Sequence, residues 1–158
     1  MKPSIKKGLS FGLTSAIITT LGLMIGLCSG TGSRLVVIGG IITIAIADAF
    51  SDALGIHIAE ESHNQNSVIE VWEATISTFL FKFVFALTFI VPVLLCPLKT
   101  AILVSVVWGL LLLGILSFHM ARDQQMRPWK VISEHLLIAA LVIVATYYVG
   151  IWVRSMFG

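Results

Sequence analysis

The chain is built from five long apolar blocks separated by short polar segments. A helix that crosses the hydrocarbon core of a bilayer needs about 20 mostly apolar residues, and each block reaches that length. The pattern therefore predicts an all-α fold: an integral membrane bundle of five transmembrane helices that forms a single domain. The expected helices lie at about residues 9–28, 35–57, 72–95, 100–120 and 131–153 of the 158-residue chain.

Composition agrees with a membrane protein and argues against the soluble classes. Apolar residues make up 58% of the chain and charged residues 11%, whereas about 25% of the residues of a soluble domain are charged. The formal net charge of +2 is small and scattered, so no nucleic-acid partner is expected. The sequence contains no phosphate-binding glycine loop, dinucleotide fingerprint or common hydrolase motif, so no enzymatic activity is predicted.

The first apolar block follows three lysines, as the apolar core of a signal peptide would. It lacks a convincing cleavage site of small residues before the next block, so Leu9–Leu27 is interpreted as the first transmembrane helix. The orientation of the bundle is predicted from its lysines and arginines, which favour the cytoplasmic side. Six would lie on the side of the N-terminus and three on the other: Lys2, Lys6, Lys7, Arg122, Arg127 and Lys130 against Arg34, Lys99 and Arg154.

This count predicts a cytoplasmic N-terminus and an external C-terminus. A short, compact chain of this kind is typical of prokaryotes, which favours the cell (inner) membrane as its location. In this topology every carboxylate and every histidine falls in the cytoplasmic half. Such a one-sided set of oxygen and imidazole groups is typical of the mouth of a cation pathway, or reflects longer, more polar cytoplasmic loops. Its members are Asp48, Asp52, Glu60, Glu61, Glu70, Glu73, Asp123, Glu134, His57, His63, His119 and His135.

The second block carries two carboxylates inside the predicted span. Asp48 and Asp52 are four residues apart, so both lie on one helix face together with Ser51 and Gly55. A carboxylate at the centre of a span costs about 2.5–3.5 kcal/mol on insertion scales. Two of them on one face are therefore functional candidates, and we predict that they bind a metal ion inside the membrane.

The third block carries Lys82. Asp48 and Lys82 each lie about eight residues from the cytoplasmic ends of their spans, which places both about 12 Å deep at the helical rise per residue. Equal depth allows an ion pair that is purely structural and leaves Asp52 less compensated. Alternatively, because a buried lysine loses its proton readily, Lys82 would exchange a proton for a metal ion.

A second group of candidates lies near the predicted cytoplasmic mouth. The face opposite Asp52 begins at His57 and continues towards Asn64, and two further carboxylates open the third span. We predict that this group captures a cation, although an ordinary solvated helix end would have the same composition. The candidate ligands are His57, Glu60, Glu61, Glu70 and Glu73.

The first block combines hydroxyl side chains with regularly spaced small residues. Its hydroxyls either bond back to their own helix or line a polar path; they belong to Thr14, Ser15, Thr19 and Thr20. The small residues permit close helix contact, either in a homodimer or within one subunit. They form two series, Gly8, Gly12 and Ala16, then Gly22, Gly26 and Gly30.

Three stretches resemble the vacuolar iron transporter family. Phe11–Leu27 resembles the first span of that family, and Ala145–Gly150 resembles its last. Ser51–His57 is similar to the end of its second span, which typically reads Ser-Met-Ala-x-Gly-Glu-Tyr. The resemblance implies five spans per subunit, a homodimer, an N-terminus inside, and export of iron(II) or manganese(II) from the cytosol in exchange for protons.

The sequence departs from the family pattern at its metal ligands. Ser15-Ala16 stands where the family has Asp-Gly, Asp52 where it has Met, and Ile56 where it has Glu. The cytoplasmic metal-binding helices between spans two and three are absent, and only residues 60–70 occupy their place. Replacement of a thioether by a carboxylate favours harder cations.

The sequence therefore predicts a proton-coupled transporter of divalent cations, with Fe²⁺ or Mn²⁺ as the suspected cargo and no bound cofactor. Two alternatives remain from the residues alone. One is a non-transporting structural or interaction protein of the same fold with a structural Asp48–Lys82 pair. The other is a small exporter of organic cations that uses a membrane carboxylate as its binding and proton site.

Overall fold

The computed structural model describes residues 1–63 and 67–158, and these residues form helices and no strands. Asn64 and the middle of the polar stretch 60–70 lie outside the described residues. The helices are α1 (Pro3–Thr31), α2 (Arg34–Glu61), α3 (Val68–Thr88), α4 (Ile90–Leu95), α5 (Leu98–Asp123) and α6 (Pro128–Phe157).

Within the described residues, five helical segments are long and apolar enough to cross a membrane, as the sequence predicted. They contain 26 to 30 residues each, and α3 and α4 together make the third, Val68–Leu95. At the helical rise per residue such segments measure about 39–45 Å, more than the roughly 30 Å hydrocarbon core. Each segment is longer than its apolar block because the helix continues into the polar flank; α2, for example, continues past His57 to Glu61.

The third span is interrupted near its end. Pro92 has no backbone N–H to donate to the carbonyl of Thr88, and its ring crowds that carbonyl. Accordingly α3 ends at Thr88 and α4 begins at Ile90, with the N–H of Phe89 bonded to the carbonyl of Ala86 at 3.2 Å. The break lies beyond Lys82, so the charged residues of this span all belong to α3.

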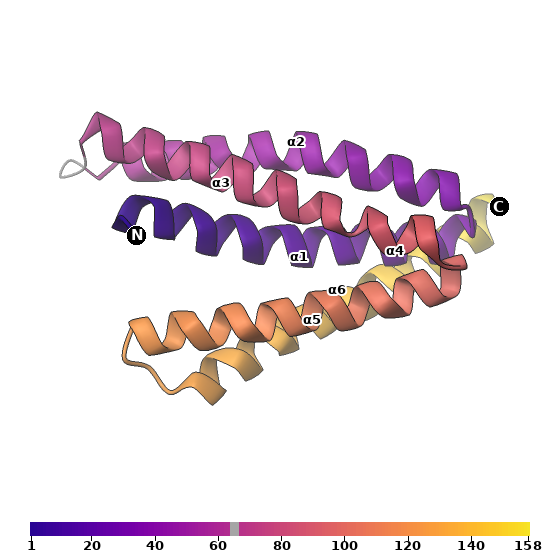
Figure 1. Ribbon diagram of the computed structural model, residues 1–158. Helices are drawn as coiled ribbons and strands as arrows, with labels where there is room; N and C mark the ends of the chain where they lie inside the picture. The colour runs from indigo at the N-terminus through magenta and orange to yellow at the C-terminus, as the bar shows by residue number, and fades with distance from the viewer. Residues whose placement is uncertain (64–66) are drawn as a thin grey trace.

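Helix α1 is the centre of the bundle. Figure 1 shows α2 and α3 on one side of it and α5 and α6 on the other. In the most apolar stretch of α1 50% of the residues are buried, whereas in that of α6 11% are buried. The two termini lie at opposite ends of the bundle, and the N-terminus shares its end with the α2–α3 and α5–α6 connections (Figure 1).

The two series of small residues in α1 serve contacts within the chain. A Cβ on Gly8 would lie 2.6 Å from the carbonyl oxygen of Ala74 in α3, so α1 and α3 touch through their backbones there. At the other end, Gly30 lies against Gly150 of α6, whose carbonyl oxygen would be 3.3 Å from a Cβ at Gly30. The spacing that suggested a close helix contact is therefore explained by α3 and α6.

The turn between α1 and α2 follows the usual chemistry of a helix end. Gly32 adopts a left-handed conformation with φ 63°, and its N–H bonds to the carbonyl of Cys28 at 2.9 Å. Glycine takes this conformation without the steric cost that a Cβ brings. Ser33 then caps α2, since its hydroxyl accepts from the N–H of Val36.

We expect Gly150→Ala to destabilise the fold because the new methyl group would lie 2.4 Å from the carbonyl oxygen of Gly26. Overpacking of this kind costs about 1–3 kcal/mol. The measurement is thermal unfolding of the purified protein in detergent. Gly114→Ala is the matched control, because no atom lies within 4 Å of a Cβ at that position. Equal melting temperatures for the two variants would contradict the close contact between α1 and α6.

Candidate functional site

The ammonium group of Lys82 is the centre of a charged cluster between three helices. Its Nζ lies 2.6 Å from Oδ2 of Asp48 and donates hydrogen bonds to Oδ2 of Asp52 and, at 2.7 Å, to Oγ of Ser15. The side chain of Lys82 is 1% exposed. The cluster joins α1, α2 and α3 through one buried cation and three oxygen atoms.

Small residues allow the three helices to come close enough for these contacts. Ala16, Ala45 and Ala86 form a buried patch, one each from α1, α2 and α3. Asp48 and Asp52 stand one turn apart on α2, so one long lysine side chain from α3 reaches both carboxylates. The predicted equal depth of Asp48 and Lys82 therefore has a counterpart in the structure.

The expectation that Asp52 is the less compensated carboxylate was wrong. Asp52 ion-pairs with Lys82 and accepts its hydrogen bond, whereas Asp48 pairs with Lys82 without a hydrogen bond. The estimate of depth identified one partner for Lys82, but an ammonium group has three N–H donors and takes several acceptors. Ser15 was missed as a partner, although its place in the first span, where the family that the sequence resembles has Asp, was a usable signal.

The cluster carries a formal charge of −1, since two carboxylates share one ammonium group. Buried charges of this kind are tolerated only when they are paired at short range. Asp48 also lines a groove of about 650 Å³ between α1 and α2, together with Leu23, Thr43 and Ser51. The ammonium group of Lys82 is therefore shielded from the surroundings, whereas Asp48 borders an open groove.

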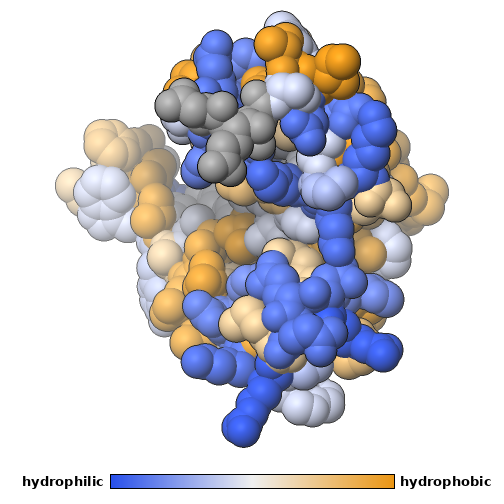
Figure 2. All heavy atoms as spheres, turned by 90° about the vertical axis from the view of Figure 1, so that its left-hand side faces the viewer, coloured by the Kyte–Doolittle hydropathy of each residue, from blue (hydrophilic) through white to orange (hydrophobic). Residues whose placement is uncertain are grey.

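We call the end of the bundle at which the N-terminus lies the polar end (Figure 1). Three further ion pairs lie there, and each of the three lysines near the N-terminus takes part in one. Lys2 pairs with Glu73 of α3, Lys6 with Asp123 of α5, and Lys7 with Glu60 of α2 at 2.8 Å. The hydrogen bond to Glu73 raises the pKa of Lys2. Figure 2 shows hydrophilic side chains spread over this end of the molecule. The start of α1 is thus tied to three other helices.

The predicted capture residues fall into separate places at that end. Glu73 accepts from Ser4 at 2.6 Å as well as from Lys2, and Glu70 forms a capping box with Ser67 at the start of α3. Glu61 is exposed. Within residues 1–63 and 67–158, no three His, Cys, Asp or Glu side chains gather in a group that could hold a metal ion.

His57 faces α3 rather than the predicted mouth. Its Nδ1 lies 2.9 Å from the hydroxyl of Thr75, and its ring meets that of Trp72 edge to face, with the centroids 4.8 Å apart. The sequence did not indicate either contact. In this structure His57 contributes to the packing of α2 against α3.

The fold and the cluster together define a polytopic helical membrane protein with an ionisable centre inside its spans. No protein-family model matches the sequence, and none of the curated proteins matches it. The resemblance to vacuolar iron transporters therefore rests on the residues quoted above.

We expect Lys82→Met to destabilise the protein strongly, because it leaves two partly buried carboxylates, those of Asp48 and Asp52, without a cation. Breaking a buried pair in this way costs about 3–5 kcal/mol. The triple variant Lys82→Met/Asp48→Asn/Asp52→Asn removes all three charges and should recover most of that loss. Thermal unfolding in detergent measures both effects. Lys99→Met is the control, because Lys99 lies at the start of α5, outside the cluster. If the single variant melts with the wild type, Lys82 does not neutralise the carboxylates.

Proposed function

We propose that the protein transports divalent metal cations, of the iron or manganese class, and exports them from the cytosol in exchange for protons. The observation that carries this proposal is the Lys82–Asp48–Asp52 cluster inside the spans. Ionisable groups at this depth are expensive, and in membrane proteins they mark ion pathways and proton relays.

The chemistry of the cluster suits a hard cation. The three atoms that surround the ammonium group are carboxylate and hydroxyl oxygens of Asp48, Asp52 and Ser15. Oxygen ligands favour magnesium, calcium or manganese over softer metals. Two carboxylates balance the charge of one divalent ion, and Lys82 releases a proton when that ion enters.

The proposed orientation places the polar end of the bundle in the cytoplasm. Lys2, Lys6 and Lys7 lie at that end with Glu60 and Glu73, and basic residues favour the cytoplasmic side. The carboxylates of this end would attract cations before they reach Asp48 and Asp52. The cell (inner) membrane is the proposed location.

A second reading has support from the same contacts. Because Lys82 pairs with both carboxylates, the cluster would also serve as a purely structural link between α1, α2 and α3. In that case the protein is a non-transporting structural or interaction membrane protein with the same five-span fold. Exchanging the charges, Asp48→Lys with Lys82→Asp, would then restore stability, and no metal would bind.

We expect Asp52→Asn to abolish proton-coupled uptake of Mn²⁺ and Fe²⁺ into proteoliposomes. Loss of the hydrogen-bonded carboxylate removes one of the two charges that would balance the ion, so the initial rate should fall at least about tenfold. Asp123→Asn is the matched control, since Asp123 lies at the end of α5 and pairs with Lys6. Uptake is measured across a pH gradient, with empty liposomes as the blank.

The outcomes separate the readings. Saturable uptake that is lost in Asp52→Asn and kept in Asp123→Asn supports the transporter. No uptake above the blank with well-folded protein favours the structural reading. Uptake of organic cations that rises with pH, with little dependence on metal identity, favours an exporter of organic cations.

The proposal includes a homodimer, which the family resemblance implies. Helix α2 has an exposed face of small residues at four-residue spacing, which is suited to close contact with another helix. This face consists of Gly39, Thr43, Ala47, Ser51 and Gly55.

We expect Ala47→Trp to turn a dimer into a monomer, because the indole ring would hold two α2 helices apart. The measurement is light scattering of the protein in detergent during size-exclusion chromatography. Ile115→Trp is the control, since Ile115 on α5 is exposed elsewhere. A monomeric wild type, or a dimer that tolerates Ala47→Trp, would refute this interface.

A further inference from the structure

The first half of α1 lies along a row of polar positions on α3, which we call the polar strip: Glu73, Ser77, Thr78 and Lys82. Helix α1 contacts α3 at both ends of the polar strip. At the polar end the hydroxyl of Ser4 donates to Glu73 at 2.6 Å, and at the inner end Ser15 accepts from Lys82 at 2.7 Å.

Between these two contacts the positions of α1 that face the strip are glycines. A Cβ on Gly8 would lie 1.9 Å from the hydroxyl oxygen of Ser77, and one on Gly12 would lie 2.7 Å from the carbonyl oxygen of Thr78. Here α1 therefore covers the strip with its backbone and without interlocking side chains.

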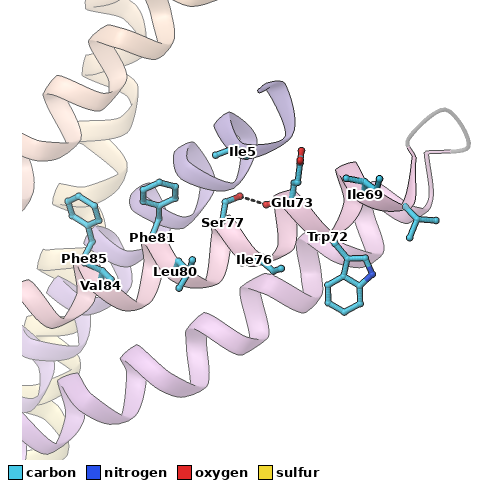
Figure 3. Close-up of a pocket in the computed structure, with 11 residues that line it drawn as sticks. Ile5, Ile69, Trp72, Glu73, Ile76, Ser77, Leu80, Phe81, Val84 and Phe85 are labelled. Atoms are coloured by element: carbon cyan, nitrogen blue, oxygen red, sulfur yellow. Dashed lines mark hydrogen bonds between the residues drawn. The ribbon is translucent and has the colours of Figure 1, made fainter. Parts of the chain in front are cut away.

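The strip is polar and largely buried, although Glu73 and Ser77 also line the open groove along α3. Ser77 is 7% exposed and Thr78 is fully buried, and each hydroxyl bonds to a carbonyl of its own helix. Figure 3 shows Glu73 and Ser77 on the side of α3 next to the start of α1, whereas Trp72 and Ile76 point to the opposite side. A continuous row of polar groups thus runs from the polar end to the charged cluster, beneath α1.

Polar contacts hold the end of this cover in place. In the ion pairs the side chains of Lys2, Lys6 and Lys7 are 65%, 42% and 53% exposed, whereas those of Glu73 and Glu60 are 20% and 11% exposed. The cations of these pairs are therefore hydrated, and the pairs remain sensitive to salt. Ile5 borders an open apolar groove of about 680 Å³ along α3 (Figure 3), so the start of α1 is not packed tightly on that side. Two glycines in one helix also weaken it locally.

We propose that residues 3–12 form a strap that lifts from α3 and opens a hydrated route along the polar strip to Lys82, Asp48 and Asp52. The ion pairs of Lys2 and Lys7 hold the strap closed, and at Gly8 and Gly12 the strap has no side chain that interlocks with the strip. This inference rests on the proposed function only in assigning the route to the transported cation. The movement itself is independent of transport.

The test is the rate at which a thiol placed beneath the strap reacts. Ser77→Cys is made in a protein whose native cysteines are changed to serine (Cys28→Ser, Cys96→Ser), reconstituted in nanodiscs and treated with a membrane-impermeant methanethiosulfonate. Lys2→Gln/Lys7→Gln should accelerate labelling about five- to tenfold, because two ion pairs no longer hold the strap. Lys99→Gln/Lys130→Gln removes two charges elsewhere and should leave the rate unchanged.

A second thiol position distinguishes lifting of the strap from general loosening. Ser105 is fully buried on α5, outside the strip, so Ser105→Cys should react slowly with or without Lys2 and Lys7. Equal acceleration at both positions, or none at Ser77→Cys, would overturn the proposal.

A salt series keeps the test valid if the double lysine variant fails to fold. With Lys2 and Lys7 intact, raising the salt from about 0.1 M to 1 M shortens the screening length from about 10 Å to 3 Å. Labelling of Ser77→Cys should then rise, and that of Ser105→Cys should not; no difference between them would refute the strap. The labelling experiment does not depend on transport. If the uptake experiments detect no transport, the labelling rates still test whether the strap moves.

Discussion

The buried ammonium group of Lys82 constrains the bundle more than any other group in it. A charge that is 1% exposed must be matched by oxygen atoms at short range, and the atoms that match it come from α1 and α2 while the lysine comes from α3. This requirement fixes the rotation of α2, since both Asp48 and Asp52 must face α3. It also fixes the axial position of α1, which brings the hydroxyl of Ser15 to the same point.

The central position of α1 follows from the absence of side chains along two of its faces. Gly8 and Gly12 bring its first half onto the backbone of α3, and Gly26 and Gly30 bring its second half onto α6. Close backbone contact is a usual way for helices to associate where burial of apolar surface provides little driving force. Helix α1 thereby joins the half of the bundle with the charged cluster to the hairpin of α5 and α6.

The five spans could be predicted from the sequence because the length of an apolar block is a direct measure of its fit to the bilayer. The pairing of Asp48 with Lys82 was accessible too, since depth follows from counting residues. The pairing of Lys82 with Asp52 was not, because it depends on the reach of one flexible side chain and on the relative rotation of the helices. For the contact of Lys82 with Ser15 the sequence offered only the place of Ser15 in the motif of the first span. The pairs of Lys2, Lys6 and Lys7 lie at the ends of helices, where water is an equally good partner for a charge, so spacing along the chain carried no signal for them.

The three lysines at the start of α1 have a different significance while the chain is being made. Lys7 precedes Glu60 by 53 residues and Lys2 precedes Glu73 by 71 residues. When α1 leaves the ribosome, these positive charges have no acidic neighbour and are fully available to hold the N-terminus on one side of the bilayer. Only after α2, α3 and α5 have been synthesised are the same charges neutralised within the folded bundle. In the proposed orientation, one short basic segment therefore acts twice, first on topology during insertion and later on tertiary structure.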